Sequence, residues 1–209
     1  MRLIAPLLAA LSLAGPSWAG DLAVTLITPN GRAVANAVVM VRPQGFSPRA
    51  PIRFPWPYRM AQKDMQFEPF VLIVPVGAEV TFPNLDEVRH HVYSFSPAKT
   101  FELKLYGRDE TRTVRFDVAG VVGLGCNIHD DMSAFVRVVD TPFAAKTSAR
   151  GEVVIRDLPA GAAMVTIWHP FLKVRGGEVI RQVTVPASGT VALSAPIDLR
   201  TPPLRRGGY

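Results

Sequence analysis

The amino-acid sequence predicts an all-β protein built from two β-sandwiches, and three observations support this. Apolar and polar residues alternate with a period of two in many short runs, such as Phe101–Leu105 and Val114–Val118. Turn residues separate the runs, as at Asn30-Gly31 and Gly176-Gly177. No stretch shows a sustained helical period of 3.6 residues. Regularly spaced short strands with turn signals between them are typical of a sandwich or a barrel.

Composition narrows the class of protein. Of the 209 residues, 48% are hydrophobic, which is enough to bury a core and excludes a disordered chain. The single cysteine excludes an intramolecular disulfide framework and a zinc site made of cysteines alone. The net charge of +6 comes from scattered basic residues, so we expect no nucleic-acid partner.

Residues 1–19 are predicted to be a secretory signal peptide. A positive start, Met1-Arg2, is followed by the apolar run Leu3–Ala14, and Ser17-Trp18-Ala19 places small residues at a cleavage site. The apolar run is too short to span a bilayer. We therefore expect a mature chain that starts near Gly20, is located in the periplasm, and has no stable membrane insertion once the signal is removed. A retained membrane anchor is the alternative.

Twelve alternating runs of the mature chain are expected to form strands. In sequence these are Leu22–Ile27, Ala37–Val41, Phe70–Val74, Glu79–Phe82, His91–Phe95, Phe101–Leu105, Val114–Val118, Phe135–Val139, Val153–Arg156, Met164–Trp168, Val179–Val185 and Thr190–Leu193. Residues 44–59 interleave prolines with aromatic residues, which predicts an extended linker whose aromatic side chains cover a core edge. Residues 201–209 are predicted to be a flexible tail.

The only cysteine lies in a short loop that also carries a histidine and a methionine. Cys126, His129 and Met132 follow a C-x2-H-x2-M spacing between two apolar runs. Thiolate, imidazole and thioether are the soft and borderline donors that copper prefers. A further donor would come from His90 or His91, far upstream. Two histidines and a cysteine in a trigonal set with a weak axial methionine make a blue-copper site.

The segment 60–140 resembles the cupredoxins, the small blue-copper electron carriers. Phe67-Glu68-Pro69 and Val76–Asn84 are similar to the family's early strands. His90-His91-Val92 is similar to its first-ligand motif, and Cys126–Met132 to its ligand loop, with amicyanin-type spacing. The resemblance implies a Greek-key β-sandwich with one type 1 copper site that alternates between Cu(II) and Cu(I). Its ligands would be His90, Cys126, His129 and Met132, with His91 as the alternative to His90. Many members carry asparagine where His91 stands.

Two other sites would use the same residues. Cys126, His129 and Asp130 have the residue types of a nucleophile, a base and an orienting group. Such triads are usually assembled from distant segments, which disfavours this hypothesis. Zinc would use the same donors, but a thioether is a poor zinc ligand. Asp130 and Asp131 are expected to form a solvated acidic rim beside the metal.

The flanks, 20–43 and 144–200, are expected to form the second sandwich. Pro29–Val41, Thr147–Val154 and the Leu158–Gly161 turn resemble the carboxypeptidase regulatory-like repeat, a small transthyretin-like or immunoglobulin-like sandwich. The resemblance implies a discontinuous domain into which the copper module is inserted. A tandem of the copper module and a C-terminal sandwich is the alternative. His169, in the second flank, is expected to be structural.

The sequence therefore predicts a periplasmic electron carrier and not an enzyme, with an unknown redox protein as its partner. From the family resemblance, His129 is expected to be the exposed edge through which electrons enter. Arg89, Arg108 and Arg112 are expected to steer an acidic partner. The alternatives are a protein that holds or delivers copper without electron transfer, and a metal-free β-sandwich interaction module.

Overall fold

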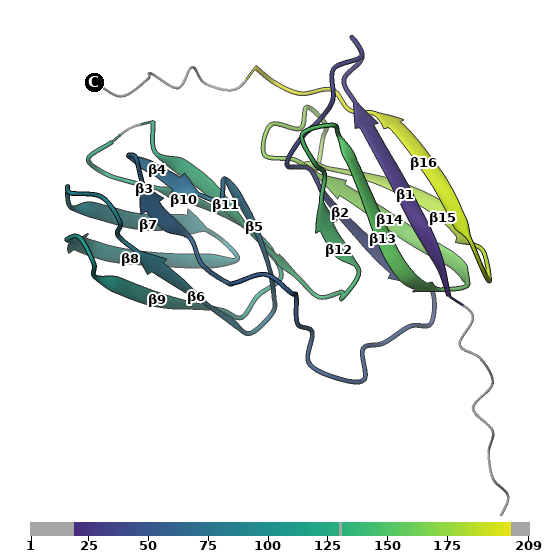
Figure 1. Ribbon diagram of the computed structural model, residues 1–209, viewed down its shortest axis with the longest axis horizontal. Helices are drawn as coiled ribbons and strands as arrows, with labels where there is room; N and C mark the ends of the chain where they lie inside the picture. Colours follow the sequence, from purple (N-terminus) through teal and green to yellow (C-terminus); the bar gives the residue numbers. More distant parts are fainter. Residues whose placement is uncertain (1–18, 130, 202–209) are drawn as a thin grey trace, which may run out of the picture.

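The structure, a computed structural model, describes residues 19–129 and 131–201, and every regular element in these ranges is a β-strand. Two lobes lie side by side (Figure 1). The all-β prediction is confirmed. The proposed signal peptide up to residue 18 and the tail from residue 202 lie outside the described residues. Within the described ranges, no helix has the length and hydropathy that crossing a bilayer demands.

Strands from both ends of the chain form the first lobe, termed the flanking lobe (residues 19–43 and 144–201). Its strands are β1 (Ala19–Ile27), β2 (Val38–Pro43), β12 (Ala144–Lys146), β13 (Glu152–Pro159), β14 (Gly161–Trp168), β15 (Glu178–Val185) and β16 (Thr190–Pro196). One sheet has the order β13-β1-β16 and the other β12-β2-β14-β15. β1 pairs antiparallel with β13 and parallel with β16, so it joins the two ends of the chain.

The core of the flanking lobe follows from the alternation of its strands. In β1, Leu22, Val24 and Leu26 are buried and belong to one hydrophobic cluster with residues of β2, β13 and β14. Successive side chains of a strand point to opposite faces, so one face of each sheet packs inward. The likeness of this lobe to the carboxypeptidase regulatory-like repeat stays a prediction.

The chain between the two flanks forms the second lobe, termed the inserted lobe (residues 60–139). Its strands are β3 (Ala61–Lys63), β4 (Gln66–Glu68), β5 (Val71–Pro75), β6 (Ala78–Pro83), β7 (His90–Ser96), β8 (Lys99–Tyr106), β9 (Thr111–Phe116), β10 (Gly120–Gly125) and β11 (Ser133–Val139). Five of them form the sheet β5-β11-β10-β7-β8. β6 pairs with β9, and β3 of the hairpin β3–β4 forms a bridge from Gln62 to Asn84, the residue that follows β6. Phe82, Tyr106 and Phe116 lie fully buried in the core of this lobe.

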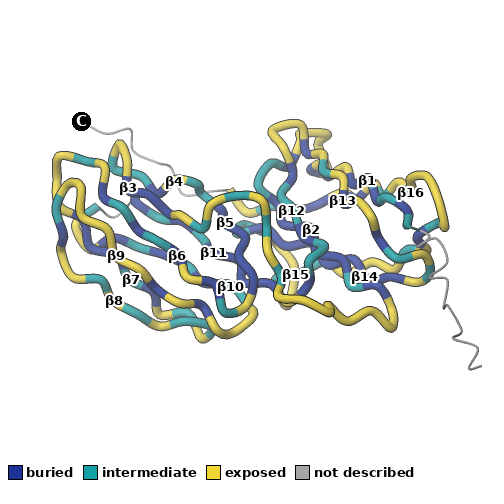
Figure 2. Tube along the Cα trace, turned by 60° about the horizontal axis from the view of Figure 1, so that its bottom comes forward, coloured by how far each residue is buried: buried dark blue, intermediate teal, exposed yellow. Residues whose placement is uncertain are grey.

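An apolar interface joins the two lobes. Trp168 of β14 packs with side chains of β2, β5 and β11, and Figure 2 shows buried backbone continuing through this region. The guanidinium of Arg137 on β11 donates a hydrogen bond of 2.5 Å to Glu178 on β15. The ammonium of Lys146 on β12 donates to the carbonyl oxygen of Val71 on β5 at 2.6 Å. Both polar contacts cross from one lobe to the other, so they fix the placement of the inserted lobe.

The proline-rich linker covers part of this interface. Phe54 and Trp56 stack with their ring centroids 4.7 Å apart and pack against the interface cluster. The indole N–H of Trp56 donates to the carbonyl oxygen of Ile73 at 2.8 Å. The expectation that aromatic side chains of the linker cover a core edge is confirmed for Phe54 and Trp56, whereas Phe46 is exposed.

Strand positions agree with the alternation in the sequence, with a few differences. Four of the described strands are absent from the predicted alternating runs. β3, β4 and β12 have three residues each and are too short to show a period of two, and β10 is an apolar and glycine run without alternation. β9 ends at Phe116, two residues before the end of the predicted run. A turn follows there, and Gly120 begins β10 with φ +151°.

Candidate metal centre

Successive side chains of β7 point to opposite faces of the sheet, so the neighbouring residues His90 and His91 lie on different faces. His90, Val92 and Ser94 are fully buried on the core side. The ring of His91 lies on the other side, 5.8 Å from the ring of Tyr93, and its Nε2 is 2.8 Å from Oε1 of Glu102 on β8. The register between β7 and β8 shifts between His90 and Val92, where two steps along β7 oppose three along β8.

Cys126 follows β10 directly and lies beside the start of β7. Gly125 pairs with Tyr93, which brings the ends of these two strands together. The Sγ atom of Cys126 lies 3.9 Å from Nδ1 of His90 and 3.9 Å from Nδ1 of His129. The three side chains offer ligand atoms that all lie within 4.8 Å of one another. Residues far apart in the chain therefore converge on one point.

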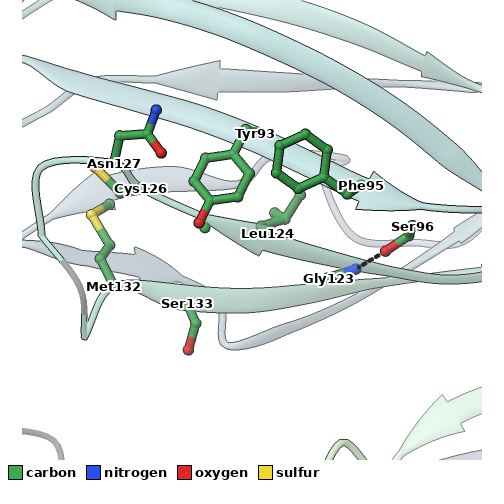
Figure 3. Close-up of a pocket in the computed structure, with 10 residues that line it drawn as sticks. Tyr93, Phe95, Ser96, Gly123, Leu124, Cys126, Asn127, Met132 and Ser133 are labelled. Carbon is green, nitrogen blue, oxygen red and sulfur yellow. Dashed lines mark hydrogen bonds between the residues drawn. The ribbon is translucent and has the colours of Figure 1, made fainter.

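The loop after Cys126 is compact and returns the chain so that Met132 lies near Cys126. The N–H of Met132 donates to the carbonyl oxygen of His129 at 2.9 Å, which closes a turn. Met132 is buried and belongs to the same hydrophobic cluster as Cys126. Figure 3 shows the two sulfur atoms pointing toward each other at one end of a pocket. The structure thus brings Met132 to the same end of the lobe as the Cys–His–His group.

The pocket has a volume of about 430 Å³, and Tyr93, Leu124, Cys126 and Met132 are among the residues that line it. Gly125 leaves room for the ring of Tyr93, because a Cβ at this position would lie 2.6 Å from Cζ of that ring. The close approach of the tyrosine ring to the backbone keeps β7 and β10 in register at the site.

Hydrogen bonds control the ionisation of Cys126. Burial raises the pKa of the thiol, but hydrogen bonds from His90, from the backbone N–H groups of His91 and Ile128, and from His129 outweigh burial. The pKa of Cys126 is lowered to about 6. Burial likewise lowers the pKa of His90, whereas its hydrogen bonds to Cys126 and Asp86 raise it, and the net pKa is raised. Without a metal, the surroundings of the sulfur therefore favour the thiolate, and those of His90 favour its protonated form.

The spacing between the sulfur and the two imidazole nitrogens is close to that around a small metal ion. With metal–thiolate and metal–imidazole bonds of about 2.3 Å and about 2.05 Å, as known for zinc, a trigonal angle separates sulfur from nitrogen by about 3.8 Å, and a tetrahedral angle by about 3.6 Å. The two observed separations of 3.9 Å are near both values, so the donor atoms are within reach of a common ion. One soft thiolate with two imidazoles, near a thioether, is a donor set that suits copper.

The sequence did not mark Asp86, which contacts a candidate ligand. Its Oδ2 accepts a hydrogen bond from Nε2 of His90 at 2.6 Å. Asp86 lies in the loop before β7, where no periodicity marks which side chains face the core. The only signal in the sequence is a carboxylate four residues before a histidine.

The structure gives different outcomes for the other residues that the sequence singled out. Asp130 lies outside the described residues, so its part in the acidic rim stays a prediction. Arg108 pairs with Glu87, and Arg112 with Glu110, so carboxylates partly neutralise both cations. His169 is buried in the flanking lobe, and its Nδ1 accepts a hydrogen bond from the N–H of Phe171, as expected for a structural histidine.

Comparison with known proteins finds similar solved structures only. No protein-family model matches the chain, and no curated protein has a matching sequence. A novel purple cupredoxin from Nitrosopumilus maritimus is 22% identical, over 39% of this chain and 98% of its own, with a TM-score of 0.36. A mutant of amicyanin in its reduced state is 19% identical, over 47% of this chain and 98% of its own, with a TM-score of 0.38.

A copper-containing nitrite reductase from Thermus scotoductus SA-01 is also similar. It is 26% identical over 47% of this chain, with a TM-score of 0.38, and the match spans 25% of the reductase. Cupredoxins are thus among the solved structures that the chain resembles, as the sequence motifs predicted. All three similarities extend over less than half of this chain.

Proposed function

We propose that the inserted lobe binds one copper ion in a type 1 site and that the protein carries single electrons between redox partners. The proposed ligands are His90, Cys126, His129 and Met132. The observation that carries this proposal is the position of one buried, thiolate-forming sulfur at 3.9 Å from two imidazole nitrogens. Bound copper would supply one-electron chemistry by alternating between Cu(II) and Cu(I).

The chain's own residues would keep the site rigid and give it one exposed edge. His90 starts β7, Cys126 follows β10, and the turn that joins Met132 to His129 fixes the loop. Ligands fixed in this way change position little when the metal changes charge, which lowers the reorganisation cost of electron transfer. His129 is half-buried whereas His90 is fully buried, so His129 is the proposed point of electron entry.

Exposed apolar side chains on the same two loops favour a weakly bound protein partner. Leu85 and Val88 lie in the loop before β7, and Ile128 lies in the ligand loop; all three are exposed. Scattered apolar side chains of this size suit a small, transient contact. With Arg108 and Arg112 in ion pairs, steering of an acidic partner would depend mainly on the exposed Arg89. We place the protein in the periplasm on the signal-peptide pattern of residues 1–19.

The contacts that join Cys126 to His90 and His90 to Asp86 also suggest a second function. A thiol, an imidazole and a carboxylate joined in this way resemble a nucleophile, a base and an orienting group. Two features favour the metal site. His129 lies at the same distance from the sulfur as His90, which a nucleophile does not need. Cys126 is also only 4% exposed, so its sulfur is poorly accessible for attack on a substrate although it lines the pocket.

Addition of Cu(II) to the purified protein tests the proposal. A type 1 site gives an intense visible absorption band with narrow copper hyperfine splitting, because the thiolate bonds strongly to the metal. Cys126→Ser should abolish the band, whereas Ser133→Ala, in the same pocket, should keep it. Pale copper that a chelator removes rapidly would support a delivery protein instead. Absence of copper binding would support a metal-free module and refute the proposal.

A further inference from the structure

Asp86 accepts a hydrogen bond from Nε2 of His90, the ring nitrogen that faces away from the sulfur of Cys126. Nε2 of His90 donates to Oδ2 of Asp86 at 2.6 Å, while Nδ1 of the same ring lies 3.9 Å from Sγ of Cys126. The side chains of His90 and Asp86 are 0% and 11% exposed. Water therefore screens this hydrogen bond little, and a carboxylate acceptor makes it a strong one.

Two consecutive backbone N–H groups of one turn fix the carboxylate of Asp86 in one orientation. Oδ1 accepts a hydrogen bond from the N–H of Asp64 at 2.6 Å, and Oδ2 accepts one from the N–H of Met65 at 3.1 Å. The N–H of Asp86 itself donates to Oδ1 of Asn84 at 2.9 Å. With both carboxylate oxygens engaged, the group that orients His90 is itself oriented.

The donors Asp64 and Met65 belong to an unusual turn. They form the two-residue connection of the β3–β4 hairpin, between the paired residues Lys63 and Gln66. Both have φ of 53°, the conformation of a type I′ turn, which usually contains asparagine and glycine. A methionine in this conformation costs about 1 kcal/mol. Strained backbone of this kind points to a functional role, and here it directs two consecutive N–H groups at Asp86.

Asn84 fixes the start of the same loop to the core. Its side chain is fully buried, and Nδ2 donates to the carbonyl oxygens of Val88 at 2.8 Å and of Tyr106 at 3.1 Å. The loop 84–89 is therefore tied to β8 and to itself before it enters β7. Asp86 has little freedom to move away from His90.

We propose that Asp86 is a positioning residue that keeps Nδ1 of His90 directed at the copper site and lowers the reduction potential of that site. This inference rests on the proposed copper function. A carboxylate that accepts a hydrogen bond from a ligand imidazole makes the imidazole more basic. A more basic ligand favours the more highly charged Cu(II) over Cu(I), and so lowers the potential. The β3–β4 turn would act on the metal through Asp86 without touching it.

The test compares two substitutions that each remove one carboxylate charge next to a histidine. Asp86→Asn weakens the bond to His90, whereas Glu102→Gln weakens the matching 2.8 Å bond to His91. We expect Asp86→Asn to lower Cu(II) affinity about tenfold with little change in Cu(I) affinity, the lower end of the range for such outer partners. For a one-electron couple, tenfold corresponds to a rise of about 59 mV in the measured potential. Glu102→Gln should leave the potential near the parent value.

No rise in Asp86→Asn, or an equal rise in both variants, would overturn the proposal. A second measurement does not depend on copper or on the folding of a variant. In NMR spectra of the metal-free parent protein, the Nε2 proton of His90 should exchange slowly and resonate far downfield. A rapidly exchanging proton there would overturn the role of Asp86. If the slow proton is present but the protein gives no visible copper band, the proposed function fails while the Asp86–His90 bond stands.

Discussion

The ionisation of Cys126 in the metal-free protein is the most direct physical consequence of the site geometry. At pH 7, a thiol with a pKa of about 6 is about nine-tenths thiolate, whereas an ordinary cysteine with a pKa near 8.5 is about 3% thiolate. The thiolate absorbs in the ultraviolet and the thiol does not. A pH titration of this absorbance should therefore show a midpoint near 6, with the signal increasing as the pH rises.

Two substitutions separate the contributions to this midpoint. Among the groups that lower the pKa of Cys126, the side chain of His90 has the largest effect, whereas His91 acts through its backbone N–H. His90→Ala should shift the midpoint upward, because the thiolate loses its main hydrogen-bond donor. His91→Ala keeps the backbone donor and removes a ring that faces Glu102, so the midpoint should stay in place.

Cys126→Ser identifies the signal, since it removes the only thiol of the chain. The reasoning would be refuted by a parent midpoint at the ordinary value for cysteine, or by equal shifts in the two histidine variants. The first result would mean that the imidazoles do not lie beside the sulfur. The second would mean that β7 does not separate the two rings.

Two further predictions concern stability, each with a matched control. Tyr106→Phe removes a buried hydroxyl that donates to Oε1 of Gln62 and to a backbone carbonyl. The free energy of unfolding should therefore fall by about 1–3 kcal/mol. Tyr93→Phe, at a half-buried ring, should change the free energy of unfolding little. Urea unfolding measures both, and equal effects would contradict the buried network. Gly151→Ala should lower the midpoint of thermal unfolding strongly, because φ is +75° and a Cβ would lie 2.3 Å from a carbonyl oxygen of β1. Gly31→Ala, with φ of +81° and open space, should lower it less, and a smaller effect at Gly151 would contradict the packing.

The sequence located the candidate donor residues, but residue type alone did not show whether His90 or His91 is the metal ligand. Alternation along β7 makes this distinction in the structure, since His90 has the same parity as the buried Val92 and Ser94. Parity is visible in the sequence, but which parity faces the core depends on the pairing of β7 with β8 and β10. The family resemblance favoured His90 before that pairing was known.

By itself, the sequence determined the all-β class and the position of most strands, because an alternation of period two is a local property of the chain. It also determined the set of soft donors, because Cys126, His129 and Met132 lie within one short loop. Only the tertiary structure decided how close His90 comes to the sulfur and that Asp86 and the β3–β4 turn support it. These contacts join segments that are distant in the chain, and their geometry depends on sheet register and on loop backbone that no local pattern records.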